Sequence, residues 1–422
     1  MSLASQPRLR RLESFPIAQP SGEVVFALRD PEGFSGAVVL PYAAALLASF
    51  MDGSRTLADI QEAFRRQSGH EVEIDDLQRL VGELDARLFL DTERFRARWK
   101  SEIEHYLNSL VRAPSHAGLA YPREPKALGE QLAGLFTCEN GPGAPRETNG
   151  HAAQGLLGVL SPHIDLQRGG PTFAWAYKRI VEESDADLFV IFGTAHNPVR
   201  HLFSVTRKHF ETPLGTVETD RQFVARLTAN LAATPGGSEL NLAADELAHR
   251  QEHSIEFQTV FLQYLLGARR PLKIVPVLVG SFHEFVESGK QPSSSAPVAA
   301  FVSALKKTLA EHSGRVCFIS GGDLAHIGQR FGDPALLDAA RLGEQAESDR
   351  ELLAAACRTD SAAFFQQVAA NGDRHRICGL SPTYTMLEVM QPARGELLKY
   401  DQAVELDGTS CVSFASAAFY RA

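Results

Sequence analysis

The 422-residue chain has few cysteines, no long apolar run and no excess of basic residues. Its five cysteines are an odd number and none is spaced C-x-x-C, so we expect no disulfide framework or zinc knuckle, and a reducing cytoplasm as location. No stretch approaches the roughly 18 consecutive apolar residues of a membrane-spanning helix, and the polar start lacks the apolar core of a signal peptide. Forty-two Lys and Arg against 51 Asp and Glu give a net charge of −9. This balance argues against nucleic acid or an anionic membrane as the main partner.

Several catalytic and cofactor motifs are also missing from the sequence. It holds no P-loop and no G-x-G-x-x-G after a predicted strand, so a nucleotide cofactor has no support. It also lacks the G-x-S-x-G elbow and the H-E-x-x-H zinc motif. What remains is an ordinary globular composition, 44% hydrophobic and 22% charged, whose length predicts two or three domains.

Residues 1–98 predict a small α+β module. Two short apolar runs, Glu23–Arg29 and Ala37–Leu40, flank a turn-forming Asp-Pro-Glu-Gly and predict a hairpin. Three helical patterns follow, and the second starts at Thr56 with a capping box. Phe89-Leu90 is predicted to form a returning strand. This order is winged-helix-like, and Leu40–Asp91 resembles the PqqD-like peptide-recognition modules.

The charge of this module favours a docking role over DNA binding. Residues 1–98 hold 12 Arg and no Lys against 15 Asp and Glu, a net charge of −3. A linking helix is expected over residues 99–112. Flexible loops are expected at Asn140–Ala152 and Glu287–Pro297, which are rich in Gly, Pro, Asn, Thr and Ser.

Residues 113–422 predict an α/β domain with a mostly parallel sheet covered by helices. Continuous apolar strands alternate with amphipathic helical segments, as such a sheet requires. The expected strands are Leu156–Leu160, Leu188–Phe192, Leu272–Val279 and Val316–Ile319. The expected helices are Thr172–Glu182, Asp220–Ala232, Ser254–Leu266 and Val298–Glu311.

Three of these strands each deliver a histidine shortly after their end. His163, His196 and His326 follow the first, second and fourth strand. Ligands bind at the carboxyl edge of open α/β sheets, where parallel strand ends leave a crevice. A single histidine after a strand is usually a loop or cap residue, but three equivalent ones predict a shared site.

Two further pairs are spaced three residues apart. His253 and Glu256 open a predicted helix and can point into one pocket, or form only a local His–Glu pair. Asp323 and His326 can form a carboxylate–imidazole pair that tunes a general acid or base; direct ligation by Asp323 is the lesser alternative. A lone cytosolic cysteine such as Cys378 is commonly a buried small hydrophobe, although its polar setting allows metal ligation.

Six ordered motifs over residues 113–422 resemble the Memo family, whose bacterial members include AmmeMemoRadiSam system protein B. The motifs are Ser161-Pro162-His163, Gly193-Thr194-Ala195-His196, Thr212–Gly215, Glu252–Glu256, Ile319–His326 and Ile377–Gly379, preceded by Ser115–Gly118 and Tyr121. The resemblance implies a fold similar to the class III extradiol dioxygenases, which bind non-haem Fe(II). It places metal ligands at His163, His196 and Cys378.

The resemblance also implies the roles of the other site residues. His326, with Asp323, stands where the dioxygenases keep their acid/base histidine. His253, Glu256 and Asp165 are expected to bind substrate; Asp165 belongs to the loop Ile164–Gly170, where the sequence departs from the family's usual Ala-Gly-Tyr.

The resulting hypothesis is a non-haem, metal-dependent, redox-type enzyme. Fe(II) is the expected metal, with copper or zinc as alternatives because a thiolate ligand is softer than a carboxylate. The substrate is expected to be a small molecule or modified peptide, and the family name implies radical SAM and AMMECR-type partners. The alternatives are a non-catalytic metal- or peptide-binding scaffold and a zinc-dependent hydrolase.

Overall fold

The computed structural model describes residues 5–19, 22–146, 155–390 and 393–421. The chain forms two compact units, Met1–Asn108 and Ser109–Ala422. The family resemblance concerns the second unit.

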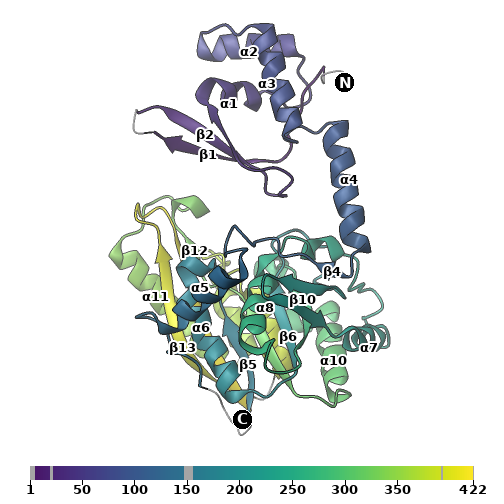
Figure 1. The fold of residues 1–422 in the computed structure, drawn as a ribbon. Helices are drawn as coiled ribbons and strands as arrows, with labels where there is room; N and C mark the ends of the chain where they lie inside the picture. The colour runs from purple at the N-terminus through teal and green to yellow at the C-terminus, as the bar shows by residue number, and fades with distance from the viewer. Residues whose placement is uncertain (1–4, 20–21, 147–154, 391–392, 422) are drawn as a thin grey trace. The chain divides into compact units, whose positions relative to one another are not determined.

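The N-terminal unit pairs a three-stranded antiparallel sheet with four helices (Figure 1). The strands are β1 (Glu13–Ala18), β2 (Val24–Arg29) and β3 (Val38–Pro41), in that spatial order. The expected hairpin is the β2–β3 pair. Strand β1 was not among the expected elements; it contains Pro16, which cannot donate a ladder hydrogen bond.

The helices of this unit bury one apolar face each. They are α1 (Tyr42–Ser49), α2 (Leu57–Ser68), α3 (Ile74–Ala86) and α4 (Glu93–Asn108). Thr56 and Asp59 form the expected capping box at the start of α2. Ile60 and Phe64 of α2 pack with Leu77 of α3 in one core.

Two elements of the first unit differ from the sequence expectation. Leu90 forms only an isolated bridge with Leu9, not a returning strand. The helix expected over residues 99–112 begins at Glu93 and ends at Asn108. Val111–Arg112 then forms a short strand, β4, within the second unit.

The second unit is built on an 11-stranded mixed sheet with a parallel centre. The central order is β5, β11, β6, β10, and these neighbours are parallel. They span β5 (Leu156–Ser161), β6 (Leu188–Thr194), β10 (Lys273–Val279) and β11 (Val316–Gly321). All four strands expected from the sequence are therefore present, and the mostly parallel, helix-covered sheet is confirmed.

Antiparallel strands extend the sheet on both sides of this centre. β14 (Cys411–Arg421) pairs with β5, and it also pairs with β12 (His326–Ile327) and β13 (Ala393–Val404). On the other side lie β9 (Gly215–Thr219), β8 (His209–Thr212) and β4, while β7 (Phe203–Val205) pairs with β10.

Helices cover both faces of the sheet, and each face has its own core (Figure 1). One core is formed with α5 (Pro125–Thr137), α6 (Leu166–Glu183) and α8 (His253–Leu266). The opposite core is formed with α7 (Arg221–Ala232), α10 (Ala296–Ala310), α11 (Ala339–Cys357), α12 (Ser361–Ala369) and α13 (Leu380–Met390). Along β6, Phe189 and Ile191 enter the first core and Val190 and Phe192 the second, as strand alternation requires.

The segment expected as a flexible loop at Glu287–Pro297 is largely helical. It contains the end of α9 (His283–Ser288), the 3-10 turn η2 (Pro292–Ser294) and the start of α10, where the Ser295 side chain caps Val298 N. Part of the other expected loop, residues 147–152, lies outside the described residues. Elsewhere in the described ranges, 3-10 turns are formed by η1 (Glu246–His249) and η3 (Gln329–Phe331).

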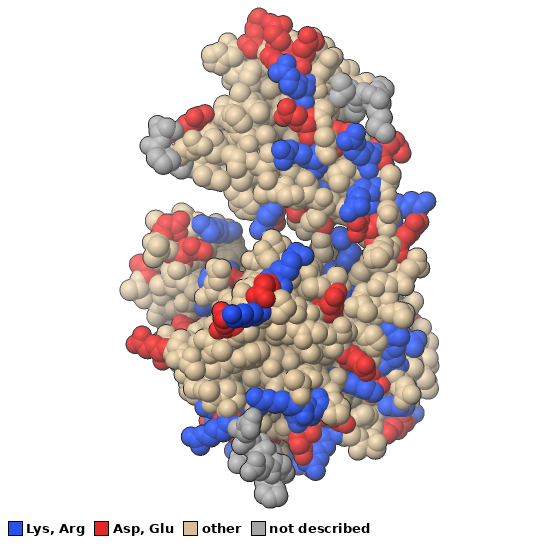
Figure 2. Space-filling model, viewed as in Figure 1, with Lys and Arg blue, Asp and Glu red and all other residues tan. Residues whose placement is uncertain are grey.

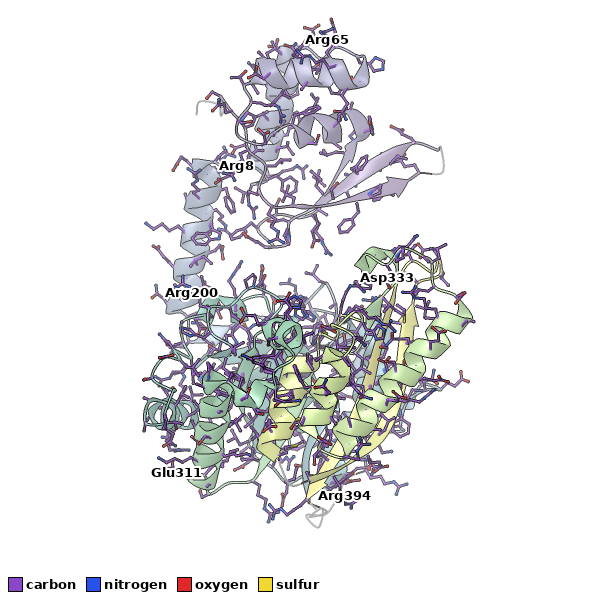
Figure 3. The ribbon with its side chains drawn as sticks, turned by 180° about the vertical axis from the view of Figure 1, so that it is seen from behind. Arg8, Arg65, Arg200, Glu311, Asp333 and Arg394 are labelled. Atoms are coloured by element: carbon purple, nitrogen blue, oxygen red, sulfur yellow. The ribbon has the colours of Figure 1, made fainter. Side chains whose placement is uncertain are left out.

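The parallel strands of the second unit all end at the same end of the sheet. Figure 3 places Arg200 and Asp333 at one end and Glu311 and Arg394 at the other. Arg200 follows the end of β6, so the first end is where the parallel strands terminate.

On the face shown in Figure 2, acidic and basic side chains are mixed over each unit. Among the described helices, none is long and apolar enough to cross a membrane.

Candidate metal centre

The ends of three parallel strands are in register and bring their loops together. Gly321 of β11 lies beside Ser161 of β5 and Gly193 of β6. His163 and Asp323 each follow two residues after these aligned positions, and His196 follows three after. The carboxyl edge therefore collects side chains from distant parts of the chain, as the sequence predicted.

His163 is at the centre of this cluster and is only 2% exposed. Its Nδ1 lies 3.0 Å from the carbonyl oxygen of Gly321. A carbonyl only accepts, so Nδ1 carries the hydrogen and Nε2 holds a free lone pair. Burial, together with the nearby His196, lowers the pKa of His163 to about 3, so the imidazole is neutral at pH 7.

Cys378 lies directly against the free nitrogen of His163. Its Sγ is 3.1 Å from His163 Nε2, and its carbonyl accepts from Thr194 Oγ1 at 2.9 Å. Burial, and then the charge of Asp323, raises the pKa of the thiol well above its usual value. A metal ion would reverse this preference, because a coordinating thiol is deprotonated.

A close approach of two glycines delivers Cys378 to this position. A Cβ on Gly379 would lie 2.5 Å from the carbonyl oxygen of Asp323, and one on Gly322 would lie 2.6 Å from Gly379 Cα. Gly379 N also donates to that Asp323 oxygen at 2.9 Å. Only glycine lets these two loops touch, so they position the thiol beside His163.

His196 is held by Glu252, the residue that caps helix α8. Its Nδ1 lies 2.9 Å from Glu252 Oε1, and its backbone N–H donates to Oε2 at 2.9 Å. Burial lowers the pKa of His196, but the hydrogen bond and charge of Glu252 outweigh burial and leave it raised. Glu252 is 4% exposed, and these contacts keep its own pKa low despite burial. His196 therefore presents Nε2, as metal-binding histidines with a carboxylate partner do.

His253, the first residue of α8, stands beside both of these imidazoles. Its ring centroid lies 4.7 Å from that of His196 and 5.1 Å from that of His163. Its Nδ1 faces Glu252 Oε1 at 3.4 Å. The expected pocket residue is thus part of the histidine cluster itself.

His326 and Asp323 lie at the same centre but do not hydrogen-bond each other. His326 Nδ1 lies 3.2 Å from the Leu324 carbonyl and 3.1 Å from that of Arg376, a non-glycine residue with φ 54°. Asp323 accepts from His163 N at 2.8 Å. Burial raises the pKa of Asp323 and lowers that of His326, and the charge of each partly offsets the shift in the other. The pair interacts through charge, while Asp323 orients the His163 loop.

Glu256 is completely buried and holds the segment after β4 onto helix α8. It forms an ion pair with Arg112 at 2.6 Å and accepts hydrogen bonds from Ser115, His116 N and the Tyr121 hydroxyl. The charge of Arg112, with His116 and Tyr121, outweighs burial and lowers the pKa of Glu256. Its oxygens accept from protein donors, and these contacts anchor the segment to α8. Substrate binding by Glu256 stays a prediction.

Asp165 caps the helix that follows the first histidine loop. Its carboxylate accepts from Gln167 N and Arg168 N at 3.1 Å each and from Arg168 Nε at 2.6 Å. These contacts start α6 six residues before the expected Thr172. Substrate binding by Asp165 stays a prediction.

In the described part of the chain, two groups of three possible ligand atoms lie within 4.8 Å of one another. One comprises His163, His196 and His253, and the other His163, Asp323 and Cys378. His196 and Cys378, both expected ligands, therefore each lie near His163, but in separate groups of three. Imidazoles held through Nδ1, a thiol and a carboxylate are a donor set that fits Fe(II), copper or zinc, because metal binding releases the protons of its ligands.

The fold and this cluster define an α/β protein with a histidine- and cysteine-rich centre at the carboxyl edge of its sheet. Residues 112–418 match the family model described as Memo-like protein. The chain therefore belongs to the Memo family, as its motifs indicated, and a relationship to the extradiol dioxygenases is consistent with that membership.

Relatives named MEMO1 family protein extend this result. That of Aquifex aeolicus is 30% identical over 405 residues, covering 95% of this chain and 97% of the relative. That of Methanopyrus kandleri is 28% identical over 321 residues, covering 74% of this chain and the whole relative. The Aquifex match therefore extends into the N-terminal unit, whereas the Methanopyrus protein corresponds to about three quarters of the chain.

No role was assigned from the sequence to three residues that organise the centre, although two of them lie in the family motifs: Glu252, Arg112 and His116. Glu252 precedes His253 and begins a helix, which is a recognisable cap position, but its contact with His196 spans 56 residues. Arg112 reaches the carbonyls of His249 and Glu252, both at 2.8 Å. His116 lies 5.4 Å from His253 between ring centroids. No local spacing indicates these long-range contacts.

Proposed function

We propose that the chain is a metal-dependent redox enzyme whose centre is built on His163, with His196 and Cys378 as further ligands. Fe(II) is the first choice and copper the second. One observation supports the proposal above the others: His163, His196 and His326 each have Nδ1 engaged by a carbonyl or carboxylate. The Nε2 atoms of the three rings are thereby turned away from these oxygens before any ion binds, and that of His163 faces the Cys378 thiol at 3.1 Å.

The remaining residues supply orientation and proton transfer in this proposal. Bound Fe(II) would supply open coordination positions and electron transfer to dioxygen or substrate. His326 is neutral because burial lowers its pKa, so its Nε2 can accept a proton from a substrate hydroxyl. Asp323 stabilises the resulting imidazolium by charge, and Glu252 keeps His196 in one tautomer. The substrate would be a small molecule or a modified peptide.

The direct test is metal analysis of the full-length protein loaded and purified without oxygen. We expect about one Fe(II) per chain, a change in its optical or spin-resonance spectrum on admission of oxygen, and loss of iron in Cys378→Ser. Cys138→Ser is the matched control, because Cys138 is exposed and far from the cluster in sequence. An iron-free wild type, or a Cys378→Ser variant that retains iron and spectrum, would contradict the proposal.

A zinc-dependent hydrolase is a second candidate, favoured by the three-imidazole group. Three histidines plus a water are the ligand set of catalytic zinc. This candidate requires hydrolysis of an ester or amide by the zinc-loaded protein at the same rate with and without oxygen. A non-catalytic scaffold would instead bind its partner unchanged after His163→Ala.

A further inference from the structure

His253 is placed among the imidazoles in a way that the expected ligand set does not use. Together with His163 and His196 it offers three nitrogen atoms within 4.8 Å of one another. The three ring centroids are separated by 4.7, 4.9 and 5.1 Å. Tetrahedral zinc sites hold nitrogen ligands at about 2.0–2.1 Å, so small side-chain movements would close these atoms around one ion.

A single carboxylate orients two of these rings. Glu252 Oε1 lies 2.9 Å from Nδ1 of His196 and 3.4 Å from Nδ1 of His253. Both rings therefore turn the same nitrogen toward Glu252 and leave Nε2 on their other side. A shared carboxylate behind two imidazoles is the arrangement that fixes metal-binding tautomers.

The thiol stands in a separate group that competes for the same nitrogen. Cys378 and Asp323 share a 4.8 Å neighbourhood with His163 and not with His253. The Nε2 of His163 has one lone pair and binds one ion at a time. The all-nitrogen set and the thiol–carboxylate set are therefore alternatives, and they differ in softness.

We propose that His253 is a metal ligand, and that Zn(II) or Co(II) is held by His163, His196 and His253 without the Cys378 sulfur. The Fe(II) of the proposed function and a soft ion such as Cu(I) take Cys378 at His163 instead. This inference rests on the proposed function in requiring that the centre binds metal, and it adds that the identity of the ion selects the ligand set.

Cobalt(II) is the probe, because its spectrum distinguishes nitrogen from sulfur ligands. The full-length protein is freed of metal and titrated with Co(II) without oxygen. We expect visible bands of a low-symmetry site without a thiolate-to-cobalt charge-transfer band in the near ultraviolet. X-ray absorption of the same sample counts sulfur neighbours directly, with no variant needed, and the expected count is zero.

Variants then assign the ligands. His253→Ala is expected to weaken Co(II) binding at least about tenfold, the loss that even a residue orienting a metal ligand causes. Cys378→Ser should bind Co(II) like the wild type but Cu(I) more weakly. His70→Gln is the matched control, since His70 is an exposed histidine of the N-terminal unit and belongs to neither ligand group. It should leave Co(II) affinity within about threefold of the wild type.

The outcomes separate this inference from the function on which it rests. A wild type that binds neither Co(II) nor Cu(I) refutes the metal centre as a whole. A wild type that binds Co(II) with a sulfur neighbour, or equally tightly after His253→Ala, refutes the role of His253 alone. Circular dichroism and thermal unfolding identify any variant that no longer folds. In that case, X-ray absorption of the Co(II)-loaded wild type decides whether sulfur is a ligand.

Discussion

Replacing Glu252 by Gln tests whether this carboxylate orients the metal-binding imidazoles, because in the wild type both of its oxygens accept from N–H groups. Oε1 accepts from Ser254 N at 3.0 Å and faces His196 Nδ1, while Oε2 accepts from His196 N. Glutamine keeps one oxygen and turns the other into an amide that can only donate. One buried N–H then faces a donor, and the preferred tautomer of His196 is lost.

The expected result is weaker metal binding with little change in fold. Loss of a carboxylate behind a metal-binding histidine typically costs 10- to 100-fold in affinity, or about 1.4–2.8 kcal/mol. The assay is competition between the anaerobic protein and a chelator of known affinity, with circular dichroism to confirm the fold. Glu284→Gln, an exposed position on α9, is the matched control. Unchanged affinity in Glu252→Gln would refute the orienting role and the reasoning built on it.

Three further predictions concern stability and loop packing. Arg112→Leu should lower the free energy of unfolding in urea by about 3–5 kcal/mol, because it leaves the Glu256 charge buried without its partner; a loss below 1 kcal/mol would contradict this. Gly379→Ala should reduce metal affinity and destabilise the fold by about 1–3 kcal/mol, whereas Gly129→Ala, which faces open space in α5, should be neutral or mildly stabilising. Burial lowers the pKa of His249 to about 3. Between pH 6.5 and 3 the unfolded chain therefore binds a proton at His249, whereas the native state leaves this imidazole neutral. Metal-free protein should therefore lose up to about 5 kcal/mol as pH falls from 6.5 toward 3, and His249→Gln should flatten that dependence; parallel pH profiles would contradict the assignment.

The parallel centre of the sheet could be predicted because its strands are continuous apolar runs. β6 is buried along its whole length, and the histidine after it follows from the strand's end. The C-terminal hairpin could not be predicted in the same way. β14 is rich in alanine and serine, which have little strand preference, and its pairing with β13 is set by the sheet around it.

The site shows the same division between local and long-range information. His163 and His196 follow from strand ends, and the assignment of Cys378 came from the family motif. The spacing of His253 and Glu256 suggested that both line a pocket, but Glu256 is directed to Arg112, 144 residues away. Periodicity describes which face of a helix a residue occupies, and it does not indicate what packs against that face.

The Arg112–Glu256 ion pair has a practical consequence for dividing the chain. The boundary between the units falls at Asn108, only four positions before Arg112. A truncated fragment that starts after Arg112 would lose the cation that compensates a fully buried carboxylate, even though every histidine of the cluster is retained. Cloning of the second unit alone should therefore begin at or before Ser109, and proteolytic cleavage between residues 113 and 115 should reduce the amount of metal that the protein retains.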